Sequence, residues 1–564
     1  MIIKKQTISF FILFCFGLLI KTVNAQNLNN LVETLATSLQ TVEAAKQEYS
    51  QSLKLLENNY VNYSLTAIDA KGNTEEVIYN FSFGDIDINT VRSVTKKDVI
   101  IVQLLINSKQ KLIKEVSNNG DKISYTDNLA FFAKNIDNAR DLVDAIKNII
   151  PTNETLEKNK LALTSYQDHI NWLEKNVQDV DNVKTQIIQK IEGSTKNDGH
   201  IKLSTTINSK SKTKAIDAEF NLATLNPNSL MYKISGEEFF IQASNRRNIK
   251  AIKVFQDGVQ QSYTNVIYFY CNSIENAKDL YKVLSQSIPL AEKALEASKP
   301  SINTTANAVS YLNKVIANIS SNETSYTQSI EGDCVSKIIV KETNPKGSTD
   351  NLYTFNFSDI NTDNIDYDSS KTQLFLEINT RKKAKFIRHL KNDELQNYTD
   401  SFKIYFENIE DALTAKEALQ TITRNCEDYQ GTPNVTSVSS GLEALKKEIT
   451  IVKIGDDNFD QTFEIVSTNP YTVKLTEVFS NLKKSVEGIF EFGLADINPK
   501  NISIATAGKS TLVELNTNHL EKIIKTYEDG NIKSYSYKLA IQATDIENAR
   551  NIAALLKQTI EQLK

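Results

Sequence analysis

The chain has 564 residues, and its 64 Lys and Arg residues nearly balance its 69 Asp and Glu residues, for a formal net charge of −5. This balance argues against a nucleic-acid partner, because phosphate backbones select strongly basic proteins. The chain has only 17 glycines, which leaves little material for glycine-rich, phosphate-binding loops.

The N-terminus has the pattern of an export signal. Two lysines precede an apolar stretch at residues 10–20, which is too short to span a bilayer comfortably. Val23 and Ala25 are small residues at the −3 and −1 positions of a cleavage site before Gln26. The sequence therefore predicts a signal peptide over residues 1–25 and an exported mature chain without a transmembrane segment. The alternative is an uncleaved anchor.

Four segments of the mature chain share one series of residues, in which a Tyr followed by Thr or Ser precedes an Ala near the start of a helix. The residues of the series are Tyr125, Tyr263, Tyr398 and Tyr535, and Ala139, Ala277, Ala412 and Ala549. Tyr and Ala are 14 residues apart each time, and successive alanines are 138, 135 and 137 residues apart. So constant a period predicts tandem copies of one domain. We interpret the recurrent Tyr as a cross-strand packing residue with its hydroxyl at the sheet edge.

The period defines four domains, which we name the first to the fourth repeat. They cover residues 26–151, 152–290, 300–426 and 437–564. Each copy has about 135 residues, the usual size of a globular domain and much longer than a solenoid unit. We therefore expect each repeat to have a core of its own.

Each repeat is predicted to end in an amphipathic helix. The expected N-cap residues are all preferred types, namely Asn135, Ser273, Asn408 and Asp545. Apolar residues follow at helical spacing, as from Ile136 to Ile150 in the first repeat, and form a single stripe. We expect Pro151 and Pro289 to end the first two of these helices.

Upstream of this helix, each repeat has strand patterns. Aromatic and apolar residues alternate with period two at residues 81–83, 220–222, 355–357 and 490–492, and turn residues follow each time. A further helix leads into each repeat, as at residues 161–177. The sequence thus predicts an α+β fold with about seven antiparallel strands per repeat. We expect these strands to form a bent sheet or partly open barrel, closed by the C-terminal helix.

This order of elements resembles the pleckstrin-homology-like superfold, in which one C-terminal helix caps a bent pair of sheets. The resemblance implies modules that bind lipids or peptides. A generic antiparallel sheet packed by one helix is the alternative. The richness in Asn, Lys and Ile and the Asn-Ala-Gln cleavage site resemble exported proteins of Bacteroidota. We expect a location in the periplasm or at the outer-membrane periphery, or outside the cell.

Three cysteines remain after removal of the signal peptide, so a fully paired disulfide framework is excluded. Cys271 aligns with apolar residues of the other repeats and is predicted to fill a buried strand position. Cys334 and Cys426 bracket the third repeat. An oxidising compartment would let them pair, and we predict this as a possible disulfide.

The sequence contains no recognisable catalytic motif, neither His-Glu-x-x-His nor Gly-x-Ser-x-Gly. Its four histidines lie in different elements without metal-ligand spacing. The third repeat has a run of acids at residues 359–368 that alternates like a calcium loop but lacks the central glycine. We predict a non-enzymatic protein without catalytic residues, metal or cofactor.

Basic residues gather at the tip of one predicted hairpin in two repeats. They are Arg246, Arg247 and Lys250 in the second repeat, and Arg381, Lys382, Lys383 and Lys385 in the third. Such tips could bind an acidic polysaccharide or a partner protein through charge. The alternative is a solvated hairpin whose charges prevent edge-to-edge association. If a polyanion binds, these residues are the candidate site.

The sequence favours an exported binding or structural protein of the cell envelope. Four homologous modules would raise its avidity for a protein or a polyanionic surface, with an envelope protein or an acidic polysaccharide as partner. One alternative is a periplasmic carrier of a lipid or small molecule. The other is a divergent hydrolase with its site in one repeat, of which the third is the most distinctive.

Overall fold

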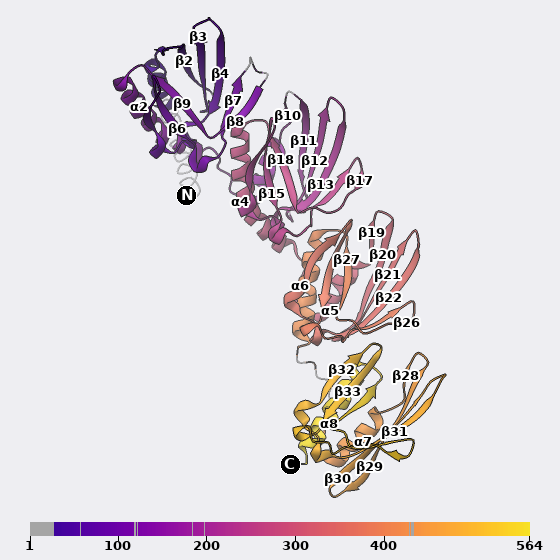
Figure 1. Cartoon of the computed structure of the whole chain (residues 1–564). Helices are drawn as coiled ribbons and strands as arrows, with labels where there is room; N and C mark the ends of the chain where they lie inside the picture. Colours follow the sequence, from indigo (N-terminus) through magenta and orange to yellow (C-terminus); the bar gives the residue numbers. More distant parts are fainter. Residues whose placement is uncertain are drawn as a thin grey trace, which may run out of the picture. The chain divides into compact units, whose positions relative to one another are not determined.

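The computed structural model describes residues 27–563 except for 57, 118, 119, 121, 183, 197, 428 and 430–433 (Figure 1). The predicted signal peptide lies outside the described residues. The chain divides into two compact units, residues 1–298 and 299–564. In the described part of each unit, the strands form two six-stranded and two three-stranded sheets, all antiparallel. The prediction of a strand-rich fold with antiparallel sheets and helices is thereby confirmed.

The first unit contains the first two repeats. In the first repeat the sheet orders are β1-β2-β3-β4-β7-β8 and β5-β6-β9, and in the second they are β10-β11-β12-β13-β16-β17 and β14-β15-β18. The first set of strands is β1 (Val42–Glu43), β2 (Gln47–Leu55), β3 (Val61–Asp69), β4 (Thr74–Phe81), β5 (Arg92–Lys96), β6 (Val99–Leu105), β7 (Ile113–Ser117), β8 (Lys122–Thr126) and β9 (Asn128–Ala133). The second set is β10 (Val180–Asp181), β11 (Thr185–Gly193), β12 (His200–Ser209), β13 (Thr213–Asn221), β14 (Met231–Ser235), β15 (Glu238–Ser244), β16 (Lys253–Gln256), β17 (Val259–Gln260) and β18 (Val266–Cys271). The helices are residues 27–38, α2 (Ile136–Lys158), α3 (Tyr166–Asn176) and α4 (Ile274–Ser298).

The second unit contains the third and fourth repeats and has the same two sheet orders. The strands of the third repeat are β19 (Asn318–Ser321), β20 (Thr324–Gly332), β21 (Val335–Asn344), β22 (Gly347–Asn356), β23 (Asp366–Ser370), β24 (Gln373–Asn379), β25 (Arg388–Lys391), β26 (Glu394–Leu395) and β27 (Ser401–Phe406). Those of the fourth are β28 (Val452–Ile454), β29 (Asp457–Thr468), β30 (Tyr471–Ser480), β31 (Ser485–Gly493), β32 (Ser503–Ala507), β33 (Ser510–Asn516), β34 (Lys525–Glu528), β35 (Asn531–Ile532) and β36 (Lys538–Ala543). The helices are α5 (Thr305–Ile316), α6 (Ile409–Asn425), α7 (Val438–Glu448) and α8 (Ile546–Glu561).

The long helices α2, α4, α6 and α8 each pack on a three-stranded sheet. In the first repeat α2 contacts β5, β6 and β9 as well as the 3-10 turn η1 (Phe83–Asp85). The middle of its apolar stripe, including Leu142 and Ile146, is fully buried, whereas its first residue, Ile136, is exposed. The four predicted N-caps are confirmed, since each side chain accepts a hydrogen bond from the backbone N–H three residues on.

Two details of the strand prediction differ from the structure. Each repeat has nine strands instead of about seven, because strands of two residues such as β1 and β17 are too short to show a periodicity. In the fourth repeat the counterpart of residues 81–83 is 492–494, not 490–492, because Gly493 precedes the 3-10 turn η11 (Leu494–Asp496). A shift of two residues keeps the same strand face, so the alternation could not reveal it.

The prediction that prolines end the first two long helices is wrong. α2 continues seven residues beyond Pro151, to Lys158, and α4 continues from Pro289 to Ser298. A proline removes one backbone hydrogen bond. Buried residues beyond it, Asn153 in α2 and Leu295 in α4, keep the last turns packed, and this packing outweighs the loss. The predicted boundaries after residues 151 and 290 therefore fall inside helices.

The recurrent tyrosine joins one repeat to the next. The Tyr125 ring stacks on Phe239 of the second repeat, with ring centroids 5.1 Å apart. Tyr398 docks on the fourth repeat, where its backbone N–H donates to the Gly508 carbonyl at 2.9 Å. Tyr535 contacts no further repeat in the described chain and is 52% exposed. The interpretation as packing within a single sheet is therefore wrong for Tyr125 and Tyr398, because one repeat alone does not show what lies beyond its edge.

A charged contact accompanies the docking of Tyr125 and of Tyr398. Lys278, the fifth residue of α4, lies 2.7 Å from Asp85 of the first repeat and also pairs with Glu157. Arg550, the fifth residue of α8, pairs in the same way with Asp359 of the third repeat. Burial alone would lower the pKa of Lys278, but the two carboxylates outweigh it and raise the pKa above its ordinary value. Lys278 therefore stays charged within this contact.

Replacing Tyr125 with Ala should show whether this residue stabilises the contact between the first and second repeats or only packs within its own repeat. We expect the free energy of unfolding of the first unit to fall by about 2 kcal/mol, because the ring loses its contact with Phe239. The matched control is Tyr535→Ala, which should change stability by less than about 0.5 kcal/mol because this Tyr is exposed. Urea denaturation of both variants measures the effect, and equal losses would contradict the docking role.

Candidate ligand-binding cleft in the first repeat

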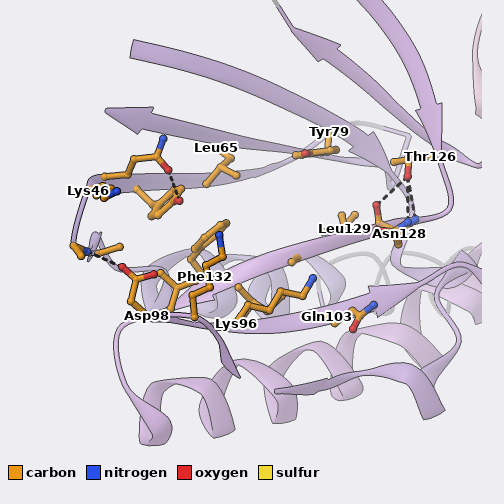
Figure 2. Close-up of a pocket in the computed structure, with 18 of the residues that line it drawn as sticks. Lys46, Leu65, Tyr79, Lys96, Asp98, Gln103, Thr126, Asn128, Leu129 and Phe132 are labelled. Atoms are coloured by element: carbon orange, nitrogen blue, oxygen red, sulfur yellow. Dashed lines mark hydrogen bonds between the residues drawn. The ribbon is translucent and has the colours of Figure 1, made fainter. Parts of the chain in front are cut away.

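A cleft of about 710 Å³ opens between the two sheets of the first repeat (Figure 2). Leu65 of β3 and Tyr79 of β4 line one wall, and Ile101 of β6 with Leu129 and Phe132 of β9 line the other. Ligand sites in proteins commonly have volumes of about 300–1,000 Å³ and mostly apolar walls. The cleft has the size of a site for a small organic molecule, and its lining mixes these apolar side chains with polar and charged ones.

A half-buried glutamine, Gln51, ties the two sheets together beside the cleft. The Gln51 amide on β2 donates to the Phe132 carbonyl at 2.9 Å, and the Phe132 N–H donates back to Gln51 Oε1 at 2.8 Å. The same reciprocal pair joins Gln189 with Tyr270, Gln328 with Tyr405 and Gln461 with Gln542. We did not predict this link. The recurrence of Gln at one position of all four repeats is the signal that could have revealed it.

Side-chain size explains the space in the first repeat. Ile101 and Leu129 correspond in strand register to Phe375 and Phe402 of the third repeat. There the Phe402 ring lies 5.0 Å from the ring of Tyr353, the counterpart of Tyr79. Aromatic rings thus occupy the region between the sheets in the third repeat. The smaller aliphatic side chains leave this region open in the first.

Charged side chains border the cleft at one end. Figure 2 shows Lys46 and Asp98 at the opposite end from Thr126 and Asn128, and Lys96 between the two ends; Lys97 also belongs to the lining. The Ala45 N–H donates to Asp98 at 2.8 Å, and this bond holds the pKa of Asp98 below its ordinary value. Asp98 is therefore ionised and fixed by the backbone, and the three lysines of the lining outnumber its two carboxylates, Asp98 and Glu115.

The polar groups of the cleft suit binding of an acceptor-rich ligand. Burial, aided by the nearby Glu115, raises the pKa of Tyr79, so its hydroxyl stays protonated and can donate a hydrogen bond. The lysines supply further donors. Within the described part of the chain, no group of three or more His, Cys, Asp or Glu side chains is placed to hold a metal ion.

The predicted basic tips form short 3-10 turns, η7 (Arg246–Asn248) and η10 (Arg381–Lys383). The first arginine of each tip is tied to its own repeat. Arg246 donates to the Leu225 carbonyl at 3.3 Å and pairs with Glu292. Arg381 donates to the Ile360 carbonyl at 3.3 Å and lies 3.4 Å from Glu427.

The other predicted tip residues extend into solvent. Arg247, Lys250, Lys382, Lys383 and Lys385 are all exposed. The two tips belong to different units. Their binding role stays a prediction, now centred on the three lysines of the third repeat.

The acids of the third repeat are engaged in structural contacts. Asp359 pairs with Arg550, and Asp366 lies 3.4 Å from Lys416. The prediction that Cys271 is a buried strand residue is confirmed, since it is only 3% exposed. Cys334 and Cys426 form a disulfide in the structure, with their Cα atoms 5.3 Å apart.

The fourth repeat places a carboxyl between its sheets, where the first repeat has Leu65. Glu477 lies on β30 opposite Gln461 and shares the inward face of the strand with Leu475. Burial raises the pKa of Glu477 to about 7. The corresponding space of the fourth repeat therefore differs in chemistry from the cleft of the first.

Glu477 should make the fourth repeat sensitive to pH. Its folded pKa lies above the ordinary value, so its contribution to stability is present at low pH and is lost as the pH rises through about 7. We expect the fourth repeat to be about 2 kcal/mol less stable at pH 8 than at pH 5, after allowance for partial solvation. Glu477→Gln should abolish this difference, whereas the exposed control Glu514→Gln should retain it. Denaturation followed by circular dichroism at both pH values measures it, and equal pH dependence in both variants would contradict the assignment.

No protein-family model matches the chain, and no curated protein or solved structure is significantly similar to it. A proposal for its function therefore has to start from the fold and the cleft. Among the helices of the described residues, none combines the length and the apolar character needed to cross a membrane.

Proposed function

We propose that the chain is an exported, non-enzymatic binding protein of the cell envelope, built from four tandem modules that each end in a closing helix. In this proposal the cleft of the first repeat binds an organic anion with an apolar part. The observation that carries it is the combination of apolar side chains with three lysines in the mixed lining of a space of about 710 Å³. The resemblance to pleckstrin-homology-like modules belongs to the same proposal.

Two features support export to the periplasm or the outer-membrane periphery. The N-terminal signal pattern directs the chain out of the cytoplasm. The Cys334–Cys426 disulfide suits an oxidising compartment, because cytosolic thiols are kept reduced.

The ligand class that fits best is a long-chain carboxylate. Its chain would pack between Leu65, Ile101 and Leu129, where burial of each methylene contributes about 0.8 kcal/mol. Its carboxylate would meet a lysine of the lining. This assignment brings the binding-protein hypothesis and the carrier hypothesis together at one site.

A second candidate activity is the binding of an acidic polysaccharide at the tip of the third repeat. It is favoured because Lys382, Lys383 and Lys385 are exposed while Arg381 is held by its own repeat. Such binding would weaken strongly with salt, whereas an apolar ligand in the cleft would depend on salt much less.

Titration calorimetry with laurate tests the cleft, with dextran sulfate as the probe for the tip. Replacing Ile101 and Leu129 with Phe introduces the larger rings of the third repeat and should reduce laurate affinity at least about tenfold. Lys97→Asn should weaken laurate binding about threefold to tenfold. The matched control is Lys371→Asn, in the corresponding turn of the third repeat, where the lysine has a φ of 53° against 54° for Lys97.

The outcomes separate the two sites. If laurate binding is lost in the Phe variant and retained in Lys371→Asn, the cleft proposal stands. Laurate affinity that is unchanged in the Phe variant, or absent in the native chain, would overturn it. Dextran sulfate binding that disappears when Lys382, Lys383 and Lys385 are changed to Glu would support the second candidate alone.

A further inference from the structure

The chain carries both halves of its own docking contact on surfaces that no repeat of the described chain covers. Within the chain, the first repeat docks on the second and the third on the fourth. We call the docking side the exit face and the receiving side the entry face. The exit face consists of the recurrent Tyr and the acid of a 3-10 turn, as in Tyr398 and Asp359. The entry face consists of a strand of the three-stranded sheet and the base at the fifth helix position, as in Arg550.

The fourth repeat has an uncovered exit face. Tyr535 and Asp496 correspond to Tyr398 and Asp359, and within the described residues Asp496 has no ion-pair partner. Ile523 corresponds to Phe386, whose ring lies 5.9 Å from the guanidinium of Arg550. Tyr535 and Ile523 are both counted among the exposed large apolar side chains. Two apolar groups and one carboxylate are therefore available to a partner.

The first repeat has an uncovered entry face. Ile136, the first residue of its closing helix, is 61% exposed, whereas its counterparts in the other repeats are 2%, 4% and 6% exposed. Ile100, in register with the buried Phe239, is also partly exposed. The surface therefore has an apolar part that matches the apolar part of the exit face.

The basic residue of this entry face, Arg140, pairs with an acid of its own helix, as Arg550 does in the docked third and fourth repeats. Arg140 lies 3.1 Å from Asp137, three residues earlier, and Arg550 lies 3.3 Å from Glu547 at the same spacing. In Arg550 another guanidinium nitrogen, Nη2, binds Asp359 of the neighbouring repeat. Arg140 is 72% exposed at its side chain, so it can bind an incoming carboxylate without breaking any buried contact.

We propose that the exit face of the fourth repeat binds the entry face of the first repeat in a second copy of this chain. The charges of Asp496 and Arg140 are complementary. The same pair of residue types, Asp and Arg, joins the third repeat to the fourth through Asp359 and Arg550. Such an interface is heterologous, so copies can add one after another. Docking within the chain is helped by the covalent link. Association between copies should therefore be weaker and dependent on concentration.

Sedimentation velocity of the mature chain over a wide concentration range tests this inference. The average mass should rise beyond that of a dimer as the concentration increases. Asp496→Lys alters only the exit face, and Ile136→Lys alters only the entry face. Each variant alone should stay monomeric, because every contact needs both faces.

Mixing the two variants gives the sharpest result. The Asp496→Lys variant keeps a native entry face, and the Ile136→Lys variant keeps a native exit face. A one-to-one dimer of the two variants should therefore form, and nothing larger. The two altered faces carry like charges and should not bind each other. Glu514→Lys, on the exposed face of β33, should associate like the native chain. Circular dichroism and Trp172 emission verify folding, and a native chain that is monomeric throughout, or variants that still associate, would overturn the inference.

Discussion

Replacing Lys278 with Ala is expected to lower the free energy of unfolding of the first unit by about 3–4 kcal/mol. Lys278 lies between Asp85 and Glu157, and burial raises the pKa of Asp85 to about 6 although the lysine opposes this shift. Removal of the only cation of this trio would leave two carboxylates close together in a largely buried place. The loss of one partner of a buried ion pair typically costs about 3–5 kcal/mol.

The single tryptophan of the chain makes this effect measurable. Trp172 lies on α3 in the first unit, so its fluorescence reports unfolding of that unit alone. The matched control is Arg140→Ala, at the same helix position of the first repeat, where the side chain is exposed. It should change the urea midpoint very little at low protein concentration. Equal shifts for Lys278→Ala and Arg140→Ala would contradict the role of the buried charges.

Replacing Cys334 and Cys426 together with Ser is expected to destabilise the second unit by about 2–4 kcal/mol. The two residues are 92 positions apart, so the disulfide closes a long loop and restricts the unfolded chain. The second unit has no tryptophan, and far-UV circular dichroism must therefore follow its unfolding. The Trp172 transition should stay unchanged, because it belongs to the first unit.

Thiol labelling of the unfolded mature chain tests the same disulfide directly. Without reductant only Cys271 should react, whereas reduction should expose all of the cysteines of the mature chain. Complete labelling without reductant would show that the bond does not form. A Trp172 transition that moves with the double Ser variant would contradict the independence of the two units.

Local sequence rules predicted the helix starts and the strand-rich character well. Asn135, Asn408 and Asp545 accept the expected N-cap hydrogen bonds, because capping depends on neighbours within one turn. Pro151 misled the prediction of a helix end, because packing of later turns against the sheet decides whether a helix continues. Such packing involves residues that are distant in the sequence.

The candidate site could not be predicted from any single segment. Ile101 and Leu129, which line the cleft from different strands, are both smaller than their counterparts Phe375 and Phe402. Its charged end depends on a turn that brings Lys97 beside Asp98 and on the distant Lys46. The docking role of Tyr125 likewise depends on a second repeat. Recurrence indicated that these positions matter but not which surface they contact.

Native mass spectrometry of the mature chain, purified after export into the periplasm, tests the central claim most directly. We expect about one equivalent of a bound organic acid per chain, and its loss when Ile101 and Leu129 are both replaced by Phe. The Lys371→Asn control should keep the bound mass. The same bound mass in the native chain and the Phe variant, or none in either, would contradict a ligand-binding cleft in the first repeat.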